Sequence, residues 1–163
     1  MIPDSLQDNA DISALEAAFS GVVFEAALDR GELTLVVDPA RIVEVARFLL
    51  TQQKYVRLSS VTAVDWTPRE PRFDVVYHLH SLSRNTRLRI KCRVGGEQPA
   101  IDSVTPVWPA ANWYEREVLD LFGIEFNNHP DPRRIMMPEN WKGHPLRKDY
   151  PVHGYKYSYQ DQR

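Results

Sequence analysis

A run of prolines near the end of the chain limits its fold more than any other feature of the sequence. The prolines stand at positions 130, 132, 138, 145 and 151, a spacing that excludes a long helix or a central strand there. The same stretch carries Met136, Trp141 and Leu146, whereas a solvated linker is normally poor in apolar residues. We therefore predict a domain of residues 1–123 and an extended tail, residues 124–163, that folds against another surface.

The charge balance and the cysteine content exclude several classes of protein. Lys and Arg number 20 against 22 Asp and Glu, so we expect no nucleic-acid partner. Cys92 is the only cysteine, which rules out an internal disulfide, a cysteine-based zinc site and a four-thiolate iron–sulfur cluster within this sequence. We expect no direct membrane span, because no apolar run approaches the roughly 18 residues that one needs, and no signal peptide is evident at the start.

The first third of the chain predicts two helices and a hairpin. Ser13 to Glu16 has the pattern of a capping box that would begin a first helix. Residues 22–28 and 33–37 are rich in β-forming residues and are joined by a loop short enough for a hairpin. Asp38 and Pro39 then predict the start of a second helix. The apolar stripe of that helix would consist of Ile42, Val45, Ala46 and Leu49.

From residue 55 the periodicity changes to two, which is typical of strands. We predict strands at about 56–64, 73–82, 86–94 and 101–104. A helix, a strand pair, a helix and then several strands indicate an α+β fold, a two-layer domain with helices packed on one face of a mixed sheet. An extended, proline-rich C-terminal tail would follow this domain.

The candidate metal and thiol sites in the sequence are weak. Cys92 shares a strand face with apolar residues, which favours a buried, inert thiol over a catalytic one. His78 and His80 share one face of a predicted strand, so both could bind the same metal ion. No further candidate ligands follow at a suitable spacing. A free-standing metal-dependent enzyme would therefore have to recruit His129 or His144.

A basic row lies on the strand at 86–94. Four cations on one strand face repel each other unless water or an acidic surface surrounds them. Such a row of cations is usually solvated by water, and the alternative is that it binds an acidic surface of a partner protein. The row consists of Arg87, Arg89, Lys91 and Arg93.

The helix that precedes the tail places one carboxylate among apolar residues. Asn112 and Glu115 have the spacing of an N-cap and its partner three residues later, and Gly123 is placed to end the helix. Glu115 falls on the apolar arc, where a carboxylate needs a cap or a cation. We expect an arginine of the tail (Arg133, Arg134 or Arg147) to pair with Glu115, and Arg116 to pair with Asp120 across one turn.

Several ordered motifs make this part of the chain resemble a known family. They run from Glu115-Arg116-Glu117 and Asp120-Leu121-Phe122-Gly123-Ile124 through His129-Pro130-Asp131 and Arg133-Arg134-Ile135 to His144-Pro145-Leu146-Arg147-Lys148-Asp149-Tyr150-Pro151. Together they closely resemble the 30 kDa, C-type subunit family of proton-pumping NADH:quinone oxidoreductase, respiratory complex I (NDH-1). Earlier segments, such as Val76-Tyr77-His78-Leu79, are similar to the same family. The resemblance covers about residues 55–151, a length that makes it highly specific.

The resemblance implies a non-redox, architectural subunit of the peripheral arm, with no catalytic residues and no cofactor of its own. FMN, iron–sulfur clusters and quinone would be bound by partner subunits, and the partners would be the quinone-site subunit and the iron–sulfur subunits of one hetero-oligomer. The location would be peripheral, on the cytoplasmic side of a bacterial inner membrane. The expected partner interface is the family signature: Glu115, Arg116, Glu117, Asp120, His129, Arg133, Arg134, Trp141, His144, Leu146, Arg147, Lys148, Asp149 and Tyr150.

Other functions are alternatives to this one. An equivalent subunit serves related membrane-bound hydrogenases and photosynthetic complexes that take electrons from another donor. The free-standing metal enzyme that uses His78 and His80 belongs to a different class, and a nucleic-acid adaptor that uses the basic row is the most distant candidate.

Overall fold

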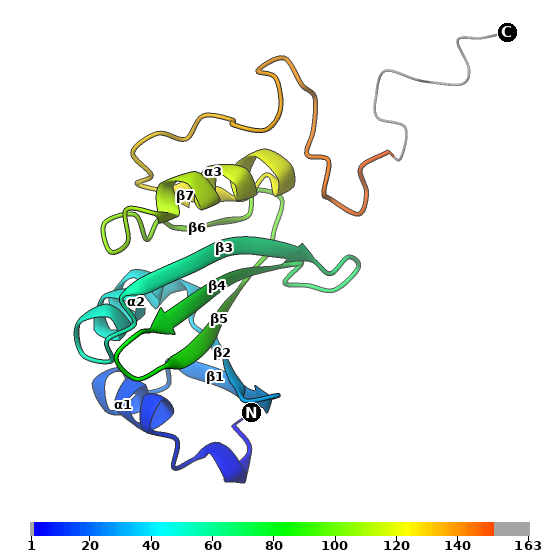
Figure 1. The fold of residues 1–163 in the computed structure, drawn as a ribbon. Coiled ribbons are helices and arrows are strands. Elements are labelled where there is room, and N and C mark those ends of the chain that lie inside the picture. Colours follow the sequence, from blue (N-terminus) through cyan, green and yellow to red (C-terminus); the bar gives the residue numbers. More distant parts are fainter. Residues whose placement is uncertain (1, 152–163) are drawn as a thin grey trace, which may run out of the picture.

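The computed structural model describes residues 2–151 and contains a five-stranded mixed sheet, three α-helices and a second, two-stranded sheet (Figure 1). The large sheet has the strand order β1-β2-β5-β4-β3, and only the pair β2 and β5 is parallel. The predicted α+β class with a mixed sheet is confirmed. The strands of the large sheet are β1 (Val23–Asp29), β2 (Glu32–Val37), β3 (Arg57–Asp65), β4 (Phe73–Ser81) and β5 (Thr86–Val94).

The helices α1 (Ala10–Ala18) and α2 (Ile42–Thr51) pack on one side of this sheet (Figure 1). A short 3₁₀ helix precedes each of them, at Asp4–Leu6 and Pro39–Arg41. The predicted stripe of α2 is confirmed, because Ile42, Val45, Ala46 and Leu49 are all buried. The alternation of β4 and β5 is also confirmed, since Tyr77, Leu79, Leu88 and Ile90 point into this core.

The start of α1 was predicted wrongly. Asn9, not Ser13, caps the helix, and its side chain accepts hydrogen bonds from the backbone N–H groups of Asp11 and Ile12. Glu16 instead reaches forward to the N–H groups of Gly21 and Val23. The signal was ambiguous because asparagine and serine are both strong N-caps.

The hairpin between β1 and β2 turns in two residues, Arg30 and Gly31, which have φ angles of 49° and 80°. Two successive positive φ angles suit the right-handed twist of the flanking strands. Asp38 accepts a hydrogen bond from the Ala40 N–H and so begins the turn that leads into α2, as the sequence predicted.

The second sheet carries the chain from the domain into the tail. Its strands, β6 (Ala100–Asp102) and β7 (Glu125–Asn127), are parallel and flank α3 (Ala111–Phe122) in the sequence. Helix α3 packs against β3, and Val118 and Phe122 join the hydrophobic core. The division of the chain after residue 123 stays a prediction, and β7 lies just beyond it.

Beyond β7 the chain has no helix or strand up to residue 151, and it runs back over α3 on the side away from the large sheet (Figure 1). Hydrogen bonds join this segment to α3 and to the corner between β3 and β4. The surface against which it folds therefore includes its own domain.

Candidate functional site

Helix α3 differs from its sequence prediction at its start and agrees with it at its end. Its N-cap position is Ala110, which makes no side-chain cap, and Asn112 lies inside the helix. The predicted cap by Asn112 and Glu115 is therefore wrong. The predicted end is confirmed, because Gly123 has a φ of +68° in the left-handed region. A Cβ at Gly123 would lie 2.5 Å from the His144 ring, so the tail could not approach any other residue this closely.

Glu115 is fully buried, and no arginine within residues 2–151 reaches it. Its carboxylate accepts hydrogen bonds from the Ser103 hydroxyl at 2.6 Å and from the Val104 backbone N–H at 2.8 Å. The expected pairing with Arg133, Arg134 or Arg147 is wrong. Burial outweighs the two donors and raises the pKa of Glu115 from 4.5 to about 7.

His129 joins the start of the tail to the first turn of α3. Its Nδ1 accepts a hydrogen bond from the Asp131 backbone N–H at 3.0 Å. A backbone N–H can only donate, so the ring proton must sit on Nε2, which lies 3.2 Å from the Asn112 carbonyl. The same Nε2 is 3.8 Å from Glu115. His129 is thus held as one neutral tautomer in this arrangement.

Asp120 is the main anchor of the tail on α3. Its Oδ2 accepts hydrogen bonds from the backbone N–H groups of Ile135, Met136 and Met137 at 3.1, 2.8 and 2.9 Å. Its Oδ1 accepts from Arg134 at 3.0 Å. The predicted pair of Arg116 with Asp120 is wrong, because the tail occupies Asp120. Burial alone would raise the pKa of Asp120, but the N–H donors and Arg134 outweigh it and lower the pKa.

Arg116 turns toward the beginning of the tail instead. Its Nε donates to the carbonyl of Arg133 at 2.9 Å, and a terminal nitrogen lies 3.4 Å from Asp131. The guanidinium also lies over the Trp113 ring, 5.0 Å from its centre. Arg133 pairs with Asp131 through two hydrogen bonds, yet 76% of its side chain stays exposed.

The last carbonyl groups of α3 are all met by the tail. His144 Nδ1 lies 2.9 Å from the Asp120 carbonyl, and the Leu146 N–H donates to the Leu121 carbonyl at 3.0 Å. Arg147 donates to the carbonyls of Phe122 and Gly123. Because the end of a helix leaves such carbonyls without intrahelical donors, these contacts complete α3.

The end of the described tail is fixed to the corner between β3 and β4. Arg72 forms hydrogen bonds with Asp65 at 2.6 and 2.9 Å and with Asp149 at 2.8 and 3.0 Å. The Lys148 N–H donates to Asp65 at 2.8 Å. Burial would raise the pKa of Asp65, but Arg72 and these N–H donors lower it well below its ordinary value. The motif Ala63-Val64-Asp65 belongs to the segments that resemble the family, but no pattern in the sequence singled out Arg72 or Ser103, because their partners are remote in the chain.

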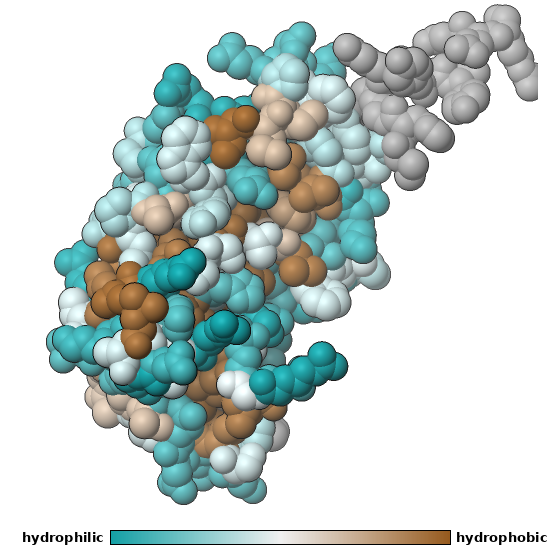
Figure 2. Space-filling view, in the orientation of Figure 1, coloured by the Kyte–Doolittle hydropathy of each residue, from teal (hydrophilic) through white to brown (hydrophobic). Residues whose placement is uncertain are grey.

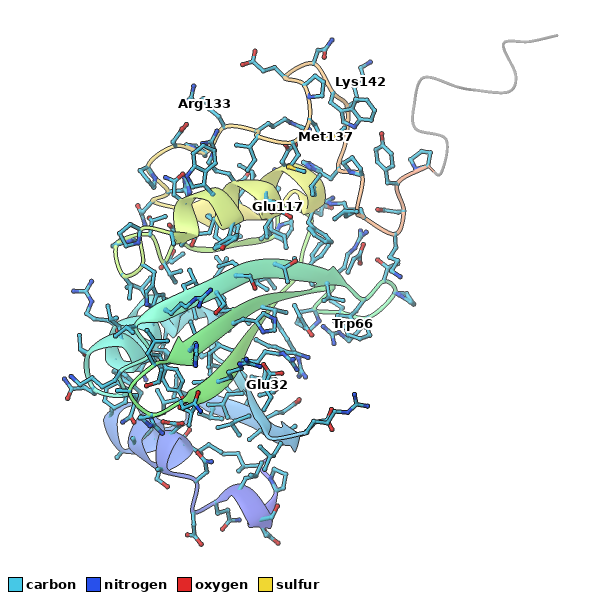
Figure 3. All side chains as sticks on the ribbon, viewed as in Figure 1. Glu32, Trp66, Glu117, Arg133, Met137 and Lys142 are labelled. Atoms are coloured by element: carbon cyan, nitrogen blue, oxygen red, sulfur yellow. The ribbon has the colours of Figure 1, made fainter. Side chains whose placement is uncertain are left out.

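The remaining signature residues lie on the outer side. Glu117 and Lys148 are exposed, Trp141 and Tyr150 are partly buried, and Leu146 is 51% exposed. Trp113 and Met136 are also exposed. Figure 2 shows apolar patches among polar residues over the part of the molecule that α3 and the tail form. Arg133 and Lys142 point outward from the tail (Figure 3). The partner interface expected on this surface stays a prediction.

The candidate thiol and metal sites from the sequence, Cys92 and the pair His78 and His80, lie in different surroundings. Cys92 is buried in the core, and burial raises the pKa of its thiol. His78 lies 3.7 Å from Glu32 on the uncovered side of the sheet, with His80 beside it in a shallow hollow. Within residues 2–151 no three His, Cys, Asp or Glu side chains are grouped so that they could hold a metal ion. None of the helices in that range is long and apolar enough to cross a membrane.

The sequence is similar to a family described as respiratory-chain NADH dehydrogenase, 30 Kd subunit, over residues 35–156. The C-type subunit of NADH-quinone oxidoreductase from Geotalea uraniireducens (strain Rf4) is 46% identical over 151 residues, which are 93% of this chain and 92% of that protein. The corresponding protein of Roseiflexus sp. (strain RS-1) is also 46% identical, over 89% of this chain and 85% of its own length.

Two solved structures resemble the fold. A trypsin-resistant fragment (1-134) of Nqo5 has a TM-score of 0.59 and 34% identity, and the match covers 65% of this chain and 87% of the fragment. A chain of the membrane-bound sulfane sulfur reductase, an archaeal respiratory membrane complex, has a TM-score of 0.69 and 27% identity. That match covers 86% of this chain and 83% of the other.

Proposed function

The chain belongs to the 30 kDa subunit family of respiratory-chain NADH dehydrogenase, and from this premise we propose that it is a non-redox, architectural subunit of a proton-translocating NADH:quinone oxidoreductase. In this role it holds the electron-transfer subunits of the peripheral arm in register. The electrons pass from NADH through FMN and iron–sulfur clusters to quinone in those partner subunits. The chain supplies binding surfaces and rigidity.

The observation that carries this proposal is the construction of the tail. Asp120 accepts a hydrogen bond from the tail backbone at Met136, the tail residue Arg147 donates to the Gly123 carbonyl, and Arg72 donates to Asp149, so the tail is held against the domain. With its backbone fixed, the tail presents Arg133, Met136 and Leu146 to the outside. Such preorganisation lowers the entropy that is lost when a partner binds. The trypsin-resistant fragment (1-134) of Nqo5 supports a division between a compact domain and a tail in this family.

The cysteine content also supports a role without redox chemistry in this chain. An iron–sulfur cluster of the common type needs four thiolates, whereas the sequence has one cysteine, which is buried. The partners are then the quinone-site subunit and the iron–sulfur subunits of the same complex, and the location is the cytoplasmic side of the inner membrane. The signature residues that face outward form the contacts.

A second candidate is the equivalent subunit of a related membrane complex with another electron donor. The likeness to a chain of the sulfane sulfur reductase complex, at a TM-score of 0.69, favours it. The architectural role is the same in both candidates. The difference lies in which donor subunit is recovered with the chain.

The experiment compares two exposed leucines. Leu146, on the tail, is 51% exposed and Leu82, at the turn after β4, is 60% exposed, so aspartate at either position leaves the core intact. In cells that carry only the variant gene, Leu146→Asp is expected to reduce the assembled complex and the NADH:quinone reductase activity of membranes several-fold. An acidic group in a desolvated contact commonly weakens binding by about 2 kcal/mol or more.

Leu82→Asp is the matched control and is expected to assemble normally. Circular dichroism of both purified variants checks that each still folds. Normal assembly of Leu146→Asp would refute the role of the tail surface. Purification of the wild-type chain without flavin, iron–sulfur or membrane subunits would refute the architectural function itself.

A further inference from the structure

Within residues 2–151, the large sheet has one face that neither the helices nor the tail covers. On β5 this face carries the basic row of Arg87, Arg89, Lys91 and Arg93, and on β4 it carries His78 and His80. The helices α1 and α2 pack on the opposite face. A polar sheet face of this kind is normally solvated by water. It indicates a binding surface for another protein only where charged side chains on the face form no ion pair within the chain.

Half of the basic row is neutralised within the chain. Glu25 forms two hydrogen bonds with Arg93, at 2.8 and 2.6 Å, and Glu32 pairs with Arg89. Asp74, at the start of β4, accepts from Arg69 and from the Trp66 indole N–H. The carboxylates in the middle of this face are therefore all occupied, and only Asp29 at its edge makes no ion pair within residues 2–151.

Three cations are left over. Arg57, Arg87 and Lys91 form no ion pair with any residue in the range 2–151. Arg57 on β3 lies opposite His80 on β4, and His80 lies opposite Arg87 on β5. Two free guanidinium groups and an imidazole thus stand in one row across three strands. Lys91 lies four residues farther along β5, which corresponds to about 13 Å in a strand.

Arg87 and Lys91, the free cations of β5, line different shallow hollows. The first hollow, of about 440 Å³, is lined by Arg87, Arg57, His78 and His80, and also by Glu32, which pairs with Arg89. The second, of about 510 Å³, is lined by Lys91, Thr34, Val36 and Trp66. It also contains two ion pairs, Arg93 with Glu25 and Arg69 with Asp74, so among the described residues Lys91 is its unpaired charge. Trp66 is 46% exposed and adds an apolar wall to the second hollow. Glu32 and Trp66 project from different ends of this side of the molecule (Figure 3).

The pattern of charge distinguishes among anionic partners. Glu32 lines the same hollow as Arg87 and Glu25 lines the same hollow as Lys91, and these carboxylates would repel a uniform polyanion such as a nucleic acid or an anionic bilayer. Two separated hollows, each with unpaired positive charge beside internal ion pairs, suit a partner with two separated carboxylates. A protein segment can provide such spacing and an apolar group for the wall at Trp66.

We propose that the uncovered sheet face is a second docking surface, which binds an acidic protein segment of another subunit through two carboxylate groups about 13 Å apart. One group would occupy the hollow at Arg57 and Arg87, and the other would pair with Lys91. The inference rests on the proposed function, because the partner is a member of the same complex. It adds a surface on the side of the sheet away from α1 and α2.

The test measures acetylation of three lysines in the intact complex and in the free chain. Lys91 reports on the sheet face, Lys142 on the tail, and the exposed Lys54 after α2 serves as the reference. Lys91 is expected to react at least about tenfold more slowly in the complex than in the free chain, as expected for an interface core. Lys54 should react equally in both.

A zero-length carbodiimide then identifies the occupant, because it joins Lys91 only to a carboxylate in direct contact. The expected product links Lys91 to an Asp or Glu of another subunit, and it should be absent from the free chain. A product with a carboxylate of this chain or of a second copy would overturn the proposal. The proposal would also be overturned if Lys91 forms no cross-link to another subunit and its protection from acetylation disappears when lipid or nucleic acid is removed.

The lysines also separate the two proposals. Protection of Lys142 with free reaction of Lys91 would overturn this inference and leave the tail surface in place. Free reaction of both in an assembled complex would overturn both. A charge reversal gives an independent readout: Arg87→Glu together with Lys91→Glu is expected to lower recovery of the acidic partner about tenfold. Arg47→Glu, on exposed α2, makes the same kind of change on the opposite side and should have no effect.

Discussion

Two buried carboxylates on α3 have pKa values that are shifted in opposite directions. Glu115 receives two hydrogen bonds, and burial outweighs them, so its pKa rises to about 7. Asp120 is equally buried, but three backbone N–H groups and Arg134 reverse the effect of burial. The number and charge of the donors decide which carboxylate stays ionised. Asp120 thus stays an ionised anchor at neutral pH, whereas Glu115 gains a proton near neutral pH.

Glu115→Gln is expected to change how stability depends on pH. Between pH 4.5 and about 7 the folded chain binds a proton at Glu115 that the unfolded chain releases, so this residue favours folding at low pH and the benefit is lost as pH rises. The difference in unfolding free energy between variant and wild type should therefore grow from pH 5 to pH 8, by up to about 3 kcal/mol. Urea unfolding at several pH values measures it.

The control for this measurement is Glu117→Gln on the exposed side of the same helix, which should leave the pH dependence unchanged. A constant difference between Glu115→Gln and wild type over the whole range would show that Glu115 has an ordinary pKa in the folded chain.

At the scale of elements, α3 and the tail complete each other. The tail satisfies the last carbonyls of α3 through His144, Leu146 and Arg147, and α3 satisfies the N–H groups of the tail through Asp120. Neither element has enough internal hydrogen bonds to be stable in this form alone. The prolines keep the tail extended, which exposes its N–H groups to Asp120. The pair therefore behaves as one structural unit.

Arg147→Ala is expected to loosen the last turn of α3 and the adjoining tail. The change removes hydrogen bonds to two carbonyls and the contact of the guanidinium with the Phe73 ring, so we expect a loss of about 2 kcal/mol in unfolding free energy. Hydrogen exchange at Gly123 and Leu146 should become faster. Arg133→Ala is the matched control, because that side chain is 76% exposed, and it should leave both quantities unchanged. Equal effects of the two substitutions would contradict the capping role.

At the scale of the whole molecule, the two surfaces that we propose for partners lie on different parts of the fold. The outer side of the tail presents Leu146 and Met136, and the uncovered sheet face presents Arg87 and Lys91. The core that joins them includes residues of the sheet and of all three helices. A chain built in this way can hold two neighbours at a fixed distance, which is what an architectural subunit must do.

Acid is expected to release the tail before it unfolds the sheet. Burial lowers the pKa of His144, so its contribution to stability falls as pH drops below 6.5 toward the lowered value. Asp65, Asp120 and Asp149 also have lowered pKa values, and their contributions are complete above 3.8 and are lost as pH falls through those values. All four groups hold the tail. Hydrogen exchange at residues 135–137 and 146 should accelerate at a higher pH than exchange in β4.

If the tail and the sheet lose their protection from hydrogen exchange at the same pH, the tail is not released before the sheet unfolds, and the prediction is contradicted. The same experiment on Arg72→Gln, which removes the cation between Asp65 and Asp149, should move the release of the tail to a higher pH.

Local sequence patterns predicted most of the elements because each depends on neighbouring residues. The stripe of α2 and the alternation of β4 and β5 follow from the periods of helix and strand, and Gly123 ended α3 because its backbone conformation favours glycine. The start of α1 was missed, since Asn9 and Ser13 are both good caps and only packing chooses between them. The proline spacing also predicted an extended tail and its need for a surface.

The ion pairs could not be predicted, because each depends on which distant segments meet. The sequence alone determined that the tail is extended, that one cysteine cannot hold a four-thiolate cluster, and that the chain resembles the 30 kDa subunit family. Only the tertiary structure decided that Asp120 rather than Glu115 binds the tail, and that Glu25 and Glu32 leave Arg87 and Lys91 unpaired. Spacing along the chain fixes which face a side chain occupies, but the partner of a charge is set by the approach of segments far apart in sequence.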